Sequence, residues 1–224
     1  MPTKIISLEL SKRILSTLKE GNFLIDYEKG KHSVVIHDAA GNDWAHLRLP
    51  LTLPYIDSEE EDTNVSYVIL LIQSGSCALG YFEGGVHLEH KIFRAYMVRK
   101  KQGKSQIKYL KTKGKSKAGS RVRLGEAREF FENINERLQE YFEYYKVGRI
   151  AMSCSKTLLP FFYQSKTPPP FDKKDERILK IPKHVHLPSY EVMMEVNEFL
   201  LKGELRYEEQ HEERVHQLLS LTKQ

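Results

Sequence analysis

The sequence predicts an α+β (or α/β) fold with a mixed β-sheet, and three neighbouring segments carry the prediction. Strand-like runs at 65–98 are separated by short turns, and a long amphipathic helix is indicated at 124–146. Between them lies a long basic loop at 99–122. Helices and strands elsewhere complete an order that is typical of a sheet flanked by helices.

The first sixty residues predict one helix and three short strands. Ser7–Glu20 has apolar residues at every fourth position and is followed by Gly21, which favours a helix that ends there. Strand-like segments follow, with turn signals between them, at 22–27, 32–38 and 44–49. We therefore expect residues 1–63 to form an N-terminal helix and a small β extension packed on the core.

The strand-like runs at 65–98 predict a meander. Val65–Ile72 is continuously apolar, as expected for a central strand covered on both faces. Cys77–Phe82 and Val86–Val98 follow after glycine-containing turns. If the last strand is unbroken, alternate side chains share one face, and these are Val86, Leu88, His90, Ile92, Arg94, Tyr96 and Val98.

The C-terminal half predicts mainly helices. Leu124–Lys146 has a sustained apolar stripe with charges opposite it. Short strands are expected at 149–153 and 178–181, and a helix with Ser189 as its N-cap is expected to run to Leu201. We expect one functional domain over 64–207 and a charged C-terminal helix over 208–224.

The positive charge is concentrated in one stretch, His90–Arg123, which has thirteen Lys or Arg and no Asp or Glu. The whole chain has a net charge of +5, whereas the residues outside this stretch carry 22 basic and 30 acidic side chains. Such a localised basic surface indicates a polyanionic partner, either nucleic acid or an anionic membrane. The expected RNA-binding residues are Lys100, Lys101, Lys104, Lys108, Lys111, Lys113, Lys115, Lys117, Arg121 and Arg123.

The chain lacks the sequence motifs of several functional classes. There is no P-loop, no Gly-x-Gly-x-x-Gly and no His-Glu-x-x-His, so we expect no cofactor and no metal. Cys77 and Cys154 are too few for a disulfide framework and lack zinc-ligand spacing. No apolar run of 18 residues occurs, so we expect a protein that does not cross a membrane. The cysteine usage and an N-terminus without a long apolar segment indicate a cytoplasmic protein, which we take to be a monomer.

The middle of the basic loop holds Gly103, Ser105 and Gln106. Small residues allow the backbone to approach a reactive bond closely and to donate N–H groups to an oxyanion. A glutamine is no strong base, but it can orient a water or a ribose hydroxyl next to a scissile ester or phosphodiester. As a lone observation, a glutamine in a basic loop is more often a bystander.

The stretch HKIFRAYMVRKKQGKSQ, the basic loop and the helix after it resemble the Vms-like release-factor family. That family is related to the peptidyl-tRNA-hydrolysing middle domain of eukaryotic and archaeal termination factors. The resemblance rests on a pattern of eight matching residues: His90, Lys91, Tyr96, Val98, Arg99, Lys101, Gly103 and Gln106. The chain departs from the pattern at Ala95, where an arginine is expected, and at Lys104, where termination factors have a second glycine.

The resemblance covers roughly residues 64–207 and implies an RNase-H-like mixed sheet with helices around it. It also implies that the loop reaches the peptidyl-transferase centre of a large ribosomal subunit, with rRNA and peptidyl-tRNA as partners. Gln106, with Ser105 and Gly103, would promote release of a stalled nascent chain, by ester hydrolysis or by cleavage at the tRNA 3′ end. His90, Arg94, Tyr96 and Arg99 would support the base of the loop. The absence of an Asn-Ile-Lys-Ser motif favours rescue over codon-directed termination, in a compact prokaryotic member.

Two other hypotheses stay open at this point. The loop could anchor a protein that binds rRNA or tRNA without chemistry. A binder of single-stranded nucleic acid is less favoured, because Tyr109 is the only aromatic residue that the loop offers for stacking.

Overall fold

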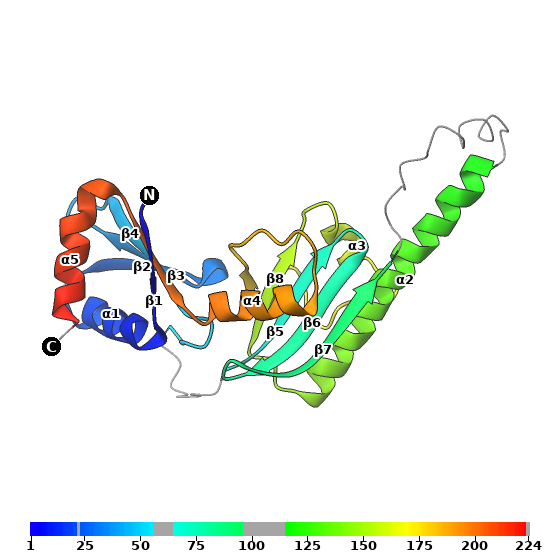
Figure 1. The fold of residues 1–224 in the computed structure, drawn as a ribbon, viewed down its shortest axis with the longest axis horizontal. Helices are drawn as coiled ribbons and strands as arrows, with labels where there is room; N and C mark the ends of the chain where they lie inside the picture. Colours follow the sequence, from blue (N-terminus) through cyan, green and yellow to red (C-terminus); the bar gives the residue numbers. More distant parts are fainter. Residues whose placement is uncertain (22, 56–64, 96–114, 223–224) are drawn as a thin grey trace.

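The computed structural model describes residues 1–21, 23–55, 65–95 and 115–222, with only the helical backbone described over 115–127. It has two lobes, each built on a five-stranded sheet (Figure 1). Helices and strands are both abundant, and the mixed sheet lies in the second lobe. The α+β prediction is therefore confirmed.

The first lobe is an antiparallel sheet with the order β1-β10-β4-β3-β2. Its strands are β1 (Thr3–Ile6), β2 (Leu24–Glu28), β3 (Ser33–His37), β4 (Asp43–Arg48) and β10 (Gly203–Tyr207). Two helices, α1 (Leu8–Glu20) and α5 (Glu212–Leu221), pack against it around a common apolar core. The short helical turns η1 (Lys29–Lys31) and η3 (Glu209–His211) complete the lobe.

The second lobe is a mixed sheet with the order β7-β6-β5-β8-β9. Its strands are β5 (Ser66–Gln73), β6 (Ser76–Glu83), β7 (Val86–Arg94), β8 (Arg149–Cys154) and β9 (Ile178–Lys180). The first three form the predicted antiparallel meander, whereas β8 runs parallel to β5 and β9 parallel to β8. Three antiparallel strands followed by two parallel ones give the RNase-H-like arrangement that was expected.

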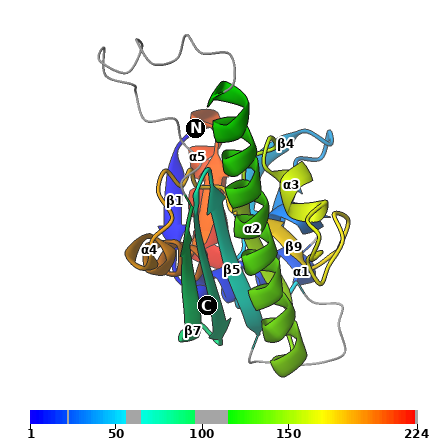
Figure 2. The same ribbon diagram turned by 90° about the vertical axis from the view of Figure 1, so that its right-hand side faces the viewer.

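Helices cover both faces of the second sheet (Figure 2). On one face lie α2 (Lys115–Tyr144) and α3 (Leu159–Tyr163), and on the other lies α4 (Tyr190–Leu200). Along β5, Val68, Leu70 and Ile72 are buried on the α2 side, while the alternate residues are buried on the α4 side. This double burial explains why β5 is apolar throughout instead of alternating.

Two predictions about this lobe are wrong in part. Helix α2 begins at Lys115, so the last part of the segment predicted as a loop, 99–122, is helical. Strand β7 contains a bulge, because Phe82 pairs with His87 whereas Tyr81 pairs with Glu89. The extra residue reverses the alternation at this point, so Val86 does not share a face with His90.

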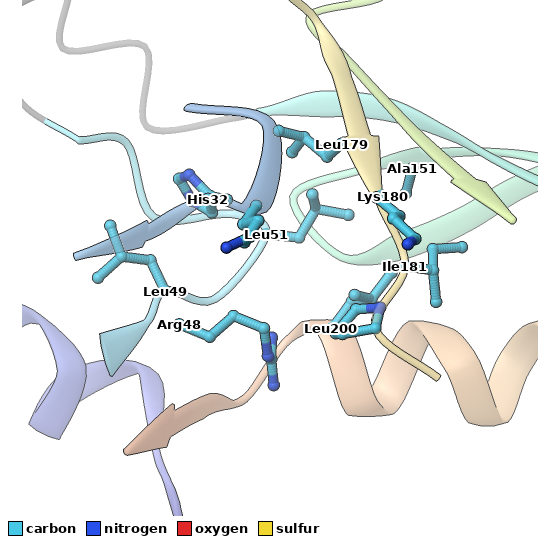
Figure 3. A pocket seen from close by; sticks show the side chains of 11 residues that line it. His32, Arg48, Leu49, Leu51, Ala151, Leu179, Lys180, Ile181 and Leu200 are labelled. Carbon is cyan, nitrogen blue, oxygen red and sulfur yellow. The ribbon is translucent and has the colours of Figure 1, made fainter. Parts of the chain in front are cut away.

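A polar cluster joins the two lobes. The guanidinium of Arg149, at the start of β8, donates hydrogen bonds to the carbonyl oxygens of Leu51 and Leu53, which follow the first sheet. Near it, His32 and Leu49 from the first lobe and Leu179 and Leu200 from the second line a small pocket (Figure 3). Residues of both lobes thus share one buried junction.

The division of the chain into residues 1–63, 64–207 and 208–224 stays a prediction. Hydrogen bonding places Gly203–Tyr207 in the first sheet, between β1 and β4. Within the ranges that the structure describes, no helix combines the length and the apolar character needed to cross a bilayer.

Candidate nucleic-acid interface

Strand β7 leads directly into the basic stretch, and it is the edge strand of its sheet. His90 pairs with Gly80 and Arg94 with Ser76, two positions of the same parity, so both side chains lie on the α4 side of the sheet. Both are exposed. The expectation that His90 shares a face with Arg94 is confirmed, and Arg94 is the last residue of the strand.

Most of the predicted site lies outside the described residues. This holds for the proposed catalytic residues Gly103, Ser105 and Gln106, and for Tyr96 and Arg99 at the base. It also holds for six of the predicted RNA-binding residues, which are Lys100, Lys101, Lys104, Lys108, Lys111 and Lys113. The remaining four lie on the first turns of α2, and these are Lys115, Lys117, Arg121 and Arg123, of which the first three were predicted to be in the loop.

Helix α2 has 30 residues, which corresponds to a length of about 45 Å. Its C-terminal half is fixed in the core, where Phe131, Ile134, Leu138 and Tyr141 are fully buried. Its first turns extend beyond the end of the sheet (Figure 1). The four cationic positions of this segment are therefore held at a distance from the rest of the lobe by a firmly anchored helix.

The same helix is tied to β7 by a polar network that the sequence analysis missed. Arg137 forms ion pairs with Glu89 on β7 and with Glu140. Tyr145, just after the helix, donates to Glu89 Oε2 at 3.3 Å, and its ring stacks on Tyr81 with a centroid separation of 4.1 Å. Desolvation and the Glu89 carboxylate raise the pKa of Tyr145, which keeps its hydroxyl protonated as a donor.

This network fixes the geometry of the interface. The basic stretch begins within strand β7 and ends within helix α2, and Glu89 and Arg137 hold these two elements side by side. One signal in the sequence was available: Glu89 is the last acidic residue before the acid-free stretch. Its partner could not be identified, because the pairing depends on how α2 lies across the sheet.

A cluster of three rings lies on the opposite side of β7, at the start of α4. We call His87, His90 and Tyr190 the ring cluster. Their ring centroids are separated by 5.0 Å (His87–His90), 4.5 Å (His90–Tyr190) and 5.4 Å (His87–Tyr190). The bulge in β7 makes this possible, because it brings His87 to the same side of the sheet as His90. The regular alternation expected from the sequence would have placed them on opposite faces.

Burial and the neighbouring His90 both lower the pKa of His87. His87 is therefore neutral near pH 7. Arg94 lies further along the same face and contributes to lowering the pKa of Glu191, after the Glu191 backbone N–H and the Ser189 hydroxyl. On its α4 side, β7 thus carries the ring cluster and, further along the strand, a cationic side chain. On its α2 side, β7 takes part in the ion-pair network with α2.

Together these elements form a surface suited to a nucleic acid. The exposed guanidinium of Arg94 can contact a phosphate, which gives affinity and orientation more than sequence specificity. The residues expected to react, Gly103, Ser105 and Gln106, lie in 96–114, outside the described part of the chain.

Comparisons with known proteins identify one family. Residues 67–219 match the family described as the Bacteroidetes VLRF1 release factor. No curated protein matches the chain. A solved structure described as "Vms1 mitochondrial localization core" aligns at 14% identity with a TM-score of 0.43, covering 90% of this chain and 82% of that one. The family match spans the mixed sheet, α2 and most of α5, and so the chain belongs to the Bacteroidetes VLRF1 release factor family.

Proposed function

We propose that the protein releases nascent chains from peptidyl-tRNA on stalled large ribosomal subunits, in rescue or quality control in the cytoplasm. The observation that carries the proposal is that the acid-free stretch begins within β7 and ends within α2. Both elements are tied together through Glu89 and Arg137. Membership of a release factor family supports the same function.

The proposed reaction depends on Gln106, together with Ser105 and Gly103. The glutamine side chain orients a nucleophilic water toward the ester between peptide and tRNA, or a ribose hydroxyl toward a phosphodiester near the tRNA 3′ end. Backbone N–H groups beside Gly103 stabilise the oxyanion that develops in either reaction. Lysines and arginines of the stretch bind rRNA phosphates and bring the glutamine to its substrate.

The experiment measures release of a labelled peptide from peptidyl-tRNA bound to isolated large subunits. Gln106→Ala is expected to lower the release rate by at least tenfold while subunit binding is unchanged. Gln102→Ala is the matched control, because it removes a glutamine from the same stretch and should leave release intact. Unchanged release with Gln106→Ala would refute the catalytic proposal and favour a non-catalytic protein that binds rRNA or tRNA.

A second measurement distinguishes the two reactions. The tRNA recovered after release is analysed at its 3′ end. An intact CCA end indicates ester hydrolysis, and a shortened end indicates cleavage within the tRNA.

A further inference from the structure

We propose that the ring cluster of His87, His90 and Tyr190 binds an unpaired base of RNA by stacking. The inference rests on the proposed function to the extent that it takes the polyanionic partner to be RNA. It adds a binding site outside the basic loop predicted at 99–122, made entirely of described residues.

The ring cluster is connected to the core by a continuous series of aromatic contacts. Tyr67 stacks on Phe82 with a centroid distance of 5.2 Å, and Phe82 contacts His87 at 5.3 Å. Tyr67 and Phe82 are fully buried, whereas His90 is exposed and Tyr190 is 36% exposed. The outer rings are thus supported from below, so stacking a base on them costs little additional ordering.

Tyr190 is held by the start of its helix. It is the first residue of α4, and the Ser189 hydroxyl caps the helix by accepting a hydrogen bond from the Val192 N–H at 3.2 Å. On the sheet side, Gly80 lies opposite His90, and a Cβ there would come within 2.6 Å of Met193 Sδ. Helix α4 therefore packs close to the sheet, which brings Tyr190 to the two histidines.

The surroundings of the ring cluster favour a single-stranded nucleic acid over a duplex. Arg94 is exposed on the same face of β7 and can contact a phosphate. Among the described residues no strand pairs with the outer side of β7, so its backbone groups there can bind a base edge. Aromatic stacking needs the face of an unpaired base, which a duplex hides, and each stacked base contributes about 1–3 kcal/mol to binding.

The test uses the full chain and two fluorescent RNAs of equal length, a single strand that ends in CCA and an A-form duplex. Tyr190→Ala and His90→Ala are expected to weaken single-strand binding about tenfold and to leave duplex binding unchanged. Tyr190→Phe keeps the ring and should bind like the wild type. Tyr144→Ala is the control, since it removes an aromatic ring that is 75% exposed at the far end of α2.

A fluorescence measurement keeps the test independent of any loss of stability. Tyr190→Trp introduces a reporter at the site, and Trp44, the only natural tryptophan, is buried in the first lobe. Single-stranded RNA should quench the new emission, and duplex RNA should not. Three outcomes would each overturn the proposal: Tyr190→Ala weakens binding of both RNAs equally, Tyr190→Ala leaves single-strand binding unchanged, or single-stranded RNA does not quench the emission of Tyr190→Trp. The ring cluster would then serve in packing or as a contact for a protein.

The outcome is separable from that of the proposed function. If Gln106→Ala releases peptide normally while Tyr190→Ala loses single-strand binding, the catalytic proposal fails and the stacking site stands. If Gln106→Ala abolishes release while the ring variants bind both RNAs normally, the reverse conclusion holds.

Discussion

Arg149 Nη1 lies 2.9 Å from His32 Nε2 at the junction of the two lobes. His32 is 4% exposed, its Nδ1 is 2.6 Å from the Tyr27 hydroxyl, and its Nε2 is 2.8 Å from the Leu53 carbonyl oxygen. Burial and the adjacent guanidinium lower the pKa of His32 to about 3. The imidazole is therefore neutral in the folded protein, and a second positive charge there would oppose Arg149 directly.

Acidification should destabilise the protein through His32. Its pKa is lower in the folded state than the usual 6.5, so the unfolded chain binds the proton first as the pH falls. The contribution of neutral His32 to the free energy of unfolding is complete above pH 6.5. It decreases by about 2 kcal/mol between pH 7 and pH 5. Urea denaturation at several pH values measures this change.

His32→Asn is the informative variant, since asparagine tolerates the left-handed backbone (φ of 50°) found at His32. The variant should show a smaller loss of stability between pH 7 and pH 5 than the wild type. If the losses of stability of the variant and the wild type between pH 7 and pH 5 differ by less than about 0.5 kcal/mol, His32 is not the cause of the acid sensitivity.

Charge reversal of Lys111, Lys113 and Lys115 should weaken binding to large subunits and reduce its dependence on salt. If each lysine contacts one phosphate, the slope of log K against log salt should fall by about two to three. Binding titrations at several salt concentrations provide the slope. Reversal of Lys166, Lys173 and Lys174, three exposed lysines elsewhere, is the control, and an equal effect of both sets would argue against a localised RNA-binding surface.

Replacing Asn135 with alanine should loosen α3. The fully buried Asn135 amide donates to the Phe162 carbonyl oxygen at 2.9 Å and to the Thr167 carbonyl oxygen at 2.8 Å. Loss of these bonds leaves buried acceptors unpaired, with a cost of about 1–3 kcal/mol. Hydrogen exchange of the α3 amides and chemical denaturation report the effect.

Gln139→Ala is the control for Asn135. Its amide donates to the Pro168 carbonyl oxygen at 2.7 Å, but the contact is exposed, and water can replace it. The unfolding free energy should change by less than about 0.5 kcal/mol. Equal effects of the two substitutions would show that burial of the amide is not the cause.

Gly203→Ala should destabilise the first lobe. A Cβ at Gly203 would approach the Ser11 hydroxyl and lie 2.8 Å from Ile6 Cγ1. The Ser11 hydroxyl is already engaged, since it donates to the Ser7 carbonyl oxygen at 2.8 Å. We expect a loss of about 1–3 kcal/mol, measured by thermal or chemical unfolding.

Gly30→Ala is the matched substitution, because no atom beyond Gly30 and its two chain neighbours lies within 4 Å of a Cβ built there. It should be neutral, or stabilising by about 0.4–1 kcal/mol through the unfolded chain. A similar loss at both glycines would exclude steric crowding at Gly203 as the reason.

Local patterns predicted much of this fold. The apolar run of β5, the N-cap at Ser189 and the stripe of α2 each depend on neighbouring residues, and all three are confirmed. Strands β1 and β10 were missed, since they are short and find their partners far away in the sequence. Helix α2 begins earlier than predicted, at Lys115, within a segment whose charge and small residues resemble a loop.

In the candidate site, too, local patterns predicted some features, whereas others depend on tertiary packing. Strand periodicity predicted that His90 and Arg94 share a face. The proximity of His87 to His90 depends on a bulge for which the sequence has no local signal. Tyr190 and Arg137 reach β7 only through the packing of α4 and α2 on opposite faces of the sheet. Roles proposed for Gln106 and its neighbours stay predictions.

The pairing of β10 with β4 has a topological consequence. Arg48 at the end of β4 forms an ion pair with Glu204 near the start of β10, with Nε and Oε2 3.2 Å apart. The chain therefore leaves the first sheet and returns to it at neighbouring points. The whole second lobe is inserted between two paired strands of the first sheet. A force applied to that lobe by a ribosome would load both connections together, and the inserted lobe could be lengthened, shortened or exchanged without interrupting the first sheet.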